Sequence, residues 1–181
     1  MRYKVSVTAG GKRILSPKSF KTKASAKRSI RIATKNDITE LVELRLELLK
    51  EVRGEVTDDI LDTYREYLGN YFQKHMIEDT FLAWLAVDEQ ENIIATSSLA
   101  IIVKQPQLWN LTGEESYIFN MYTKPERRRK GIGKILLEKL LEESKKRGIK
   151  KVTLHATPVG RILYEKYGFK NSEGTMNLWL E

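Results

Sequence analysis

The spacing of hydrophobic residues divides most of the chain into alternating helical and extended segments. Apolar residues at intervals of three and four predict four helices, over residues 37–52, 57–76, 133–147 and 158–167. Apolar runs and two-residue alternation predict six strands, over residues 30–33, 81–87, 93–103, 117–123, 152–156 and 176–180. This order predicts an α/β (α+β) domain with a single mixed, mostly antiparallel twisted sheet that has helices on both faces.

The first 29 residues differ from the rest of the chain in charge. They contain nine Lys and Arg and no Asp or Glu, so the remaining residues sum to −1 although the whole chain carries +8. Alternation over residues 3–7, before the glycine pair 10–11, predicts a β-hairpin, and Thr22 could cap a short helix. A mitochondrial transit peptide or a fusion segment would have a similar composition. We therefore divide the chain into a basic extension, 1–29, and a domain, 30–181.

The composition excludes several classes of chemistry. The chain contains no cysteine and two histidines, His75 and His155. Disulfides, thiolate nucleophiles and cysteine-ligated zinc are therefore impossible. We expect no metal site, although a metal held by carboxylates alone stays open. No apolar segment is long enough for a membrane span or a secretory signal, which favours a cytoplasmic protein without a membrane partner. The charge gives a reason to expect nucleic-acid binding only in the extension. Both a monomer and a homodimer are compatible with the sequence.

The segment Arg128-Arg129-Lys130-Gly131-Ile132-Gly133 lies between a predicted strand and a predicted helix. Two glycines at such a junction let backbone N–H groups approach a bulky anion, and the helix N-terminus adds partial positive charge, so the loop suits a pyrophosphate. Leu136 replaces the third glycine of a dinucleotide fingerprint, and no Gly-Lys-Ser/Thr of a P-loop follows, which indicates another phosphorylated ligand. The alternative interpretation is a solvated basic turn or a nucleic-acid contact.

The segment from Tyr122 to Gly133, together with Leu163-Tyr164-Glu165-Lys166-Tyr167-Gly168-Phe169, resembles the Gcn5-related N-acetyltransferase (GNAT) superfamily, whose loop follows Gln/Arg-x-x-Gly-x-Gly/Ala. The resemblance extends in element order from about Ile30 to the C-terminus. It implies the acyl-CoA N-acyltransferase fold and acetyl-CoA as cosubstrate. It implies that the pantetheine and the acetyl carbonyl are received by backbone groups of Met121, Tyr122 and Thr123. It also implies that the pyrophosphate is surrounded by Arg128, Arg129, Lys130, Gly131, Ile132, Gly133 and Lys134.

The resemblance further implies a cleft and an acid. The strand over 152–156 should separate from the strand over 117–123 and open the cleft, and Tyr164 matches the family's tyrosine that protonates the departing thiolate. The chemistry agrees, because a phenol stays protonated at neutral pH and a strand N–H such as that of Tyr122 can stabilise an oxyanion. Direct transfer needs no covalent enzyme intermediate, which suits a chain without cysteine.

The chain departs from the family pattern at two positions. Many members carry a glutamate as general base in the strand before the loop, whereas this strand contains none and has Asn120 as its only amide. Asn120 could orient a water or the acceptor, or bond a neighbouring strand. Glu114, Glu115 and His155 are the other candidates for the base, which is unassigned. Thr157 replaces a common asparagine and keeps a hydroxyl for pantetheine or for a helix cap.

Together these observations predict an acetyl-CoA-dependent N-acetyltransferase that transfers the acetyl group directly to a primary amine of a small molecule or peptide. By analogy with the family, the helices over 37–52 and 57–76 would frame the acceptor pocket. One alternative is a non-catalytic acyl-CoA-binding sensor, which the missing glutamate favours slightly. In another, the basic extension directs a peptide or ribosomal-protein acetyltransferase to a nucleic acid or a ribosome.

Overall fold

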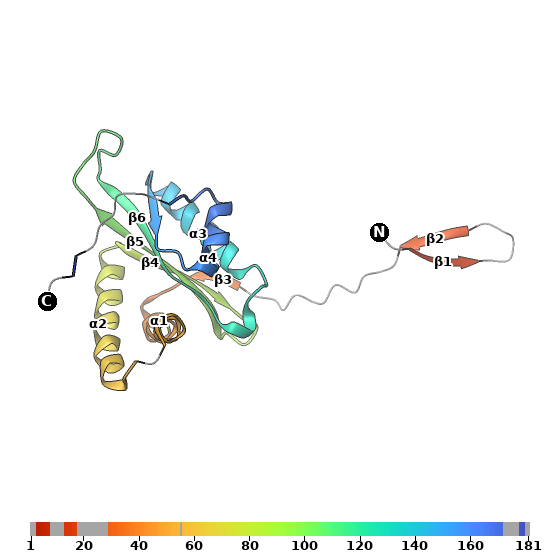
Figure 1. Cartoon of the computed structure of the whole chain (residues 1–181), viewed down its shortest axis with the longest axis horizontal. Coiled ribbons are helices and arrows are strands. Elements are labelled where there is room, and N and C mark those ends of the chain that lie inside the picture. Colours follow the sequence, from red (N-terminus) through yellow and green to blue (C-terminus); the bar gives the residue numbers. More distant parts are fainter. Residues whose placement is uncertain (1–2, 8–12, 18–28, 55, 172–177, 180–181) are drawn as a thin grey trace.

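The computed structural model describes residues 3–7, 13–17, 29–54, 56–171 and 178–179, the first two ranges as backbone only. A five-stranded sheet is built from β3 (Ser29–Ile32), β4 (Phe81–Val87), β5 (Ile93–Val103), β6 (Glu114–Thr123) and β7 (Val152–Leu154). The strands lie side by side in chain order (Figure 1). Neighbours are antiparallel except β6 and β7, which pair in parallel. The predicted mixed, mostly antiparallel sheet is confirmed.

Helices cover both faces of this sheet (Figure 1). They are α1 (Ile38–Arg53), α2 (Asp58–Ile77), α3 (Ile132–Lys146) and α4 (Pro158–Lys166), with 3-10 turns η1 (Lys35–Asp37) and η2 (Pro125–Arg127). α1 and α2 pack on one face through a core that includes Leu41, Phe72 and Phe81, and α3 packs on the other through Leu99 and Leu137. The four predicted helices are confirmed, with ends within one residue. None of the described helices is long and apolar enough to cross a membrane.

The strands differ from the predicted ones at their ends. β6 starts at Glu114, three residues before the predicted start, because the polar residues that precede Tyr117 still pair with β5. β7 ends at Leu154, two residues before the predicted end. Most of the predicted last strand, 176–180, lies outside the described residues. Residues 178–179 are described, are exposed and belong to no strand.

The basic extension contains the predicted hairpin. β1 (Tyr3–Val7) pairs in antiparallel fashion with β2 (Arg13–Pro17). The short helix expected after Thr22 lies outside the described residues. The sheet begins at Ser29, one residue before the expected start of the domain, and the division of the chain at this point stays a prediction.

Asp37 connects the start of the sheet to α1. Its carboxylate accepts hydrogen bonds from the Arg31 guanidinium at 2.7 and 2.8 Å, and from the N–H and Oγ1 of Thr34 at 2.7 and 3.0 Å. These bonds, that of Arg31 above all, outweigh desolvation and lower the pKa of Asp37 to about 2. The folded state therefore favours the ionised carboxylate.

We expect Asp37→Asn to lower the free energy of unfolding at pH 7 by about 2 kcal/mol, because hydrogen bonds to a charged group contribute more than those between neutral groups. The pKa is depressed in the folded state, so this contribution is present above about pH 4 and is lost as the pH falls toward 2. Urea unfolding at pH 7 and at pH 3 measures both effects. Glu66→Gln, at an exposed position of α2, is the control. If Asp37→Asn lowers the free energy of unfolding equally at both pH values, the stabilising role of the ionised Asp37 carboxylate is contradicted.

Candidate active site

The last two strands of the sheet separate after a short pairing. The parallel pairing of β6 with β7 covers Ser116 to Ile118 on β6. β7 then ends at Leu154, whereas β6 continues to Thr123. Residues 119–123 of β6 therefore have no strand on their β7 side in the described chain. We call this stretch the open edge of β6, and it is the separation that the sequence predicted.

A bulge at Asn120 interrupts the pairing of β6 with β5. Asn120 and Met121 lie opposite a single β5 residue, Ser97. Asn120 has a φ of +51°, in the left-handed region, and its side chain is buried. Its Oδ1 and the Oγ of Ser97 have no hydrogen-bond partner among the described residues. The Oδ1 therefore does not bond a neighbouring strand in the described chain. Leaving a buried amide oxygen without a hydrogen bond is costly.

The backbone bonds beside the bulge decide which groups face the open edge. The N–H of Lys124 donates to the Ile94 carbonyl of β5 at 3.0 Å. Because such bonds alternate along an antiparallel strand, the Tyr122 N–H also points toward β5, and the N–H groups of Met121 and Thr123 point toward the open edge. Met121 therefore offers an N–H to a carbonyl oxygen, where the sequence suggested Tyr122.

The glycine loop lies between η2 and α3. Arg129 and Gly131 have φ values of +61° and +76°. α3 starts at Ile132, which is buried. Within the described chain, no side chain caps this N-terminus, and the first turn of α3 holds no acidic residue. The first N–H groups of α3 are thus available to an anion, with the partial positive charge of the helix behind them.

The basic side chains of the loop have different surroundings. Arg128 donates to a β6 carbonyl at 2.8 Å and forms an ion pair with Glu51 of α1. Its guanidinium therefore holds the loop to α1, and the predicted contact of Arg128 with the pyrophosphate stays a prediction. Lys130 donates to a backbone carbonyl of η2 at 3.0 Å. Arg129 is exposed and contacts no charged group in the described part of the chain, so it remains available to an anion. Lys134 is exposed as well, and its Nζ lies 3.8 Å from a carboxylate oxygen of Glu138.

Tyr164 projects from α4 into the core beneath α3. Its side chain is buried, and burial raises the pKa of the hydroxyl, which is therefore protonated at neutral pH. No residue of the described ranges forms a hydrogen bond with that hydroxyl. Gly160 leaves room for the ring, because a Cβ there would lie 3.0 Å from it. Thr157 Oγ1 accepts the Gly160 N–H at 3.2 Å and so caps α4, while its contact with pantetheine stays a prediction.

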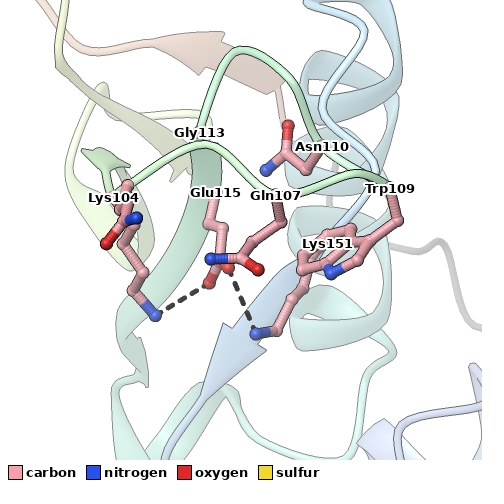
Figure 2. Close-up of a pocket in the computed structure, with 8 residues that line it drawn as sticks. Lys104, Gln107, Trp109, Asn110, Gly113, Glu115 and Lys151 are labelled. Atoms are coloured by element: carbon pink, nitrogen blue, oxygen red, sulfur yellow. Dashed lines mark hydrogen bonds and ion pairs between the residues drawn. The ribbon is translucent and has the colours of Figure 1, made fainter.

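The two glutamate candidates for the base lie far from the bulge. Glu115 is buried near the start of β6, where Lys104 and Lys151 bind its two oxygens at 2.9 and 3.2 Å (Figure 2). Desolvation raises the pKa of this carboxyl, but the two lysines outweigh it and the net pKa is lowered. Glu115 is therefore a poor proton acceptor. Five and six residues of strand also place Glu115 and Glu114 about 16 and 20 Å from Asn120.

His155 follows directly after the end of β7. Its Nδ1 lies 2.8 Å from the Tyr117 hydroxyl, and the two rings meet edge to face. Tyr117 stacks on Phe119, which in turn packs against Tyr71 of α2. We call Tyr71, Phe119, Tyr117 and His155 the aromatic row. Of the three candidates for the base, His155 is the one that lies beside the open edge.

A hollow of about 470 Å³ along α2 adjoins the aromatic row and shares Tyr71 with it. The lining consists of Tyr64, Tyr67, Leu68, Asn70, Tyr71, Lys74 and His75. No group of three potential metal ligands occurs in the described residues.

Sequence reasoning missed Ser97 and Tyr117. A run of three hydroxyl residues inside an apolar strand was a signal for Ser97, whereas Tyr117 could not be distinguished from a core aromatic.

Comparison with known proteins agrees with this arrangement. Residues 43–169 match the Acetyltransferase (GNAT) family. The match spans more than half of the chain and includes the open edge of β6, the glycine loop and α4. The chain belongs to the GNAT acetyltransferase family and is an acyltransferase; GNAT enzymes act on amine acceptors.

Two relatives extend this result. The crystal structure of a predicted acetyltransferase from Clostridium acetobutylicum with acetyl-CoA is 36% identical, with a TM-score of 0.77 over 84% of this chain and 96% of that one. Glucosamine 6-phosphate N-acetyltransferase from Arabidopsis thaliana is 25% identical over 138 residues, 75% of this chain and 87% of its own length. The crystal structure of the Arabidopsis protein has a TM-score of 0.63 at 26% identity and covers 86% of this chain and 99% of its own. The predicted fold is confirmed.

Proposed function

We propose that this protein transfers the acetyl group of acetyl-CoA directly to a primary amine of a small molecule or a peptide. The observation that carries the proposal is the open edge of β6, which leads into the glycine loop. In the described part of the chain, Asn120 Oδ1 at its bulge has no partner and no side chain caps the N-terminus of α3 after the loop. The family of the chain, and its similarity to an N-acetyltransferase and to a protein solved with acetyl-CoA, support it.

The residues present fit acetyl-CoA along its length. Bound acetyl-CoA supplies a thioester with an electrophilic carbonyl carbon. The N–H groups of Ile132 and Gly133 at the start of α3, with Arg129 and Lys134 around them, hold the pyrophosphate. The open edge of β6 offers unpaired backbone groups to the pantetheine arm, and the Met121 N–H donates to the acetyl oxygen as negative charge develops there.

Three side chains then move or hold protons. Asn120 Oδ1, which is buried and has no partner among the described residues, accepts a hydrogen bond from a water that orients the amine. His155 takes the proton that the amine loses when the C–N bond forms. The protonated hydroxyl of Tyr164 donates to the sulfur as the C–S bond breaks, so that CoA leaves as a thiol.

Amine-dependent release of CoA tests the proposed function. A thiol-reactive dye reads free CoA without interference, because the chain contains no cysteine. We expect a panel of primary amines to include acceptors that raise the rate of release well above the rate without amine. Saturable binding of acetyl-CoA with no effect of any amine would favour a non-catalytic binding module. No binding of acetyl-CoA would contradict the site itself.

A cytoplasmic location, a monomeric or homodimeric state and a targeting role for the basic extension stay predictions. Deletion of residues 1–28, which spares β3, tests the targeting role. Unchanged RNA binding with an unchanged salt dependence would exclude it.

A further inference from the structure

Arg45 occupies a position of α1 where the helical pattern calls for an apolar residue. It follows Leu41 and Val42 and precedes Leu48 and Leu49, in each case by three or four residues, and all four pack in the core. Residues at these intervals share one face of a helix. The Arg45 side chain therefore leaves α1 on the side of the sheet, where it is half-buried.

The guanidinium of Arg45 reaches between α2 and β6. Its Nε donates to the Tyr64 hydroxyl of α2 at 3.5 Å, which is long for a hydrogen bond. On the β6 side, burial raises the pKa of the Tyr117 hydroxyl and the positive charge of Arg45 partly opposes the rise, so the two groups are near each other. Tyr64 lines the hollow along α2, and Tyr117 belongs to the aromatic row. Arg45 thus lies where these two surfaces meet.

Arg45 differs from comparable arginines in having no counter-charge among the residues described. The other half-buried arginines form the ion pairs Arg31–Asp37, Arg65–Glu43, Arg127–Asp88 and Arg147–Glu143. Among the residues described, no carboxylate pairs with Arg45. A guanidinium that is partly removed from water without an anion loses solvation that a single long hydrogen bond to a hydroxyl replaces poorly, and an anionic ligand would offset that cost.

The site at Arg45 is separate from the site proposed for the pyrophosphate. Side chains of α1 meet β6 and the glycine loop in sequence order, in the contacts Arg45 with Tyr117, Glu47 with Tyr122, and Glu51 with Arg128. Six residues separate Arg45 from Glu51, which is about 9 Å along the helix. An anion at Arg45 would therefore lie on the acceptor side and would not be the pyrophosphate of acetyl-CoA.

We propose that Arg45 binds an anionic group of the acceptor, so that the enzyme acetylates amines that carry a carboxylate or a phosphate. The inference rests on the proposed function, because it names the class of acceptor for that same site. A guanidinium binds either anion through paired N–H donors. The aromatic row beside it offers a surface for the carbon skeleton of the acceptor.

Pairs of amines that differ in charge test this inference. Phenylalanine is compared with phenylalaninamide, and glucosamine 6-phosphate with glucosamine, by the release of CoA thiol. We expect the anionic member of at least one pair to have a KM about 10- to 100-fold lower than its neutral partner. The pair that shows the difference reports whether the carboxylate or the phosphate is preferred. Equal KM values within both pairs would overturn the inference.

Variants of Arg45 give a second, independent readout. Arg45→Gln should raise KM for the preferred anionic amine about 10- to 100-fold and leave KM for its neutral partner nearly unchanged, and Arg45→Lys should restore part of the loss. Arg53→Gln removes the same charge at an exposed position of α1 and is the matched control. A loss of equal size for both amines, or from Arg53→Gln, would overturn the assignment to Arg45.

A binding measurement separates this inference from the proposed function. Calorimetry measures the binding of two pairs of acetylated products to the full-length protein in the presence of CoA. The pairs are N-acetylphenylalanine with N-acetylphenylalaninamide, and N-acetylglucosamine 6-phosphate with N-acetylglucosamine. If the wild-type protein binds a charged ligand and Arg45→Gln abolishes that binding, the anion site is supported. If, in addition, no amine releases CoA, the proposed transfer is contradicted and the anion site is not. Absence of any charge preference in both binding and turnover would overturn the inference.

Discussion

Gly131→Asp is expected to weaken the binding of acetyl-CoA about 100-fold or more, because it places a carboxylate where the pyrophosphate should lie. Gly131 immediately precedes α3 and has a φ of +76°, and nothing in the described chain lies within 4 Å of the position of an added Cβ. The new side chain would therefore be accommodated without collision, and its negative charge would also occupy the N–H groups that begin α3. Calorimetric titration of acetyl-CoA measures the change in Kd.

Gly131→Asn separates the effect of charge from that of backbone conformation. Asparagine has the shape of aspartate and tolerates the left-handed region about equally well, but it is neutral. We expect its Kd to lie much nearer to that of the wild-type protein. Equal weakening by both variants would attribute the loss to the backbone, and normal binding by Gly131→Asp would mean that the loop does not hold the pyrophosphate.

Tyr164→Phe is expected to lower kcat about 100-fold while leaving the Kd for acetyl-CoA nearly unchanged. The variant keeps the ring that packs in the core beneath α3 and removes a hydroxyl that no described residue binds. In the proposed mechanism this hydroxyl gives its proton to sulfur as the C–S bond breaks, so its loss should affect the chemical step rather than binding. Steady-state kinetics with a saturating amine, together with calorimetry, measure the two quantities.

Tyr167→Phe is the matched control for this variant. The Tyr167 hydroxyl donates to the Glu138 carboxylate, and this bond raises the pKa of Tyr167 to about 12. Removing that hydroxyl should cost some stability and leave kcat unchanged. Weakened binding of acetyl-CoA with an unchanged kcat in Tyr164→Phe would show that the hydroxyl contacts the ligand without serving as the acid.

Local patterns in the sequence were sufficient for much of the fold. β4 and β5 are buried on both faces along most of their length. β4 therefore appears in the sequence as an uninterrupted apolar run of strand length, and β5 as two apolar runs on either side of residues 96–98. The glycine loop was also predictable, because a left-handed residue beside a helix N-terminus requires glycine or a tolerant residue. Signals of this kind depend on neighbours in the chain.

The features that were not predictable depend on residues far apart in the sequence. Arg128 is held by Glu51, 77 residues earlier, and no local pattern indicates that its guanidinium is engaged. Glu115 was a reasonable base until the fold placed two lysines on its oxygens. Arg45 did carry a local signal, a charge inside the apolar face of a helix, but its meaning depends on the absence of a described carboxylate nearby.

An unpaired strand edge is normally a hazard, since it invites another strand to add to the sheet and so promotes aggregation. Two features of β6 oppose the addition of another strand at its open edge. The bulge at Asn120 breaks the regular spacing of its polar groups, and Arg128 already binds the carbonyl of Thr123 at its end. A second peptide chain could not form a regular ladder of backbone hydrogen bonds along this edge. A pantetheine arm, which has two amides, needs only a few such bonds. The geometry proposed to admit a pantetheine arm thus also discourages the addition of a strand at this edge.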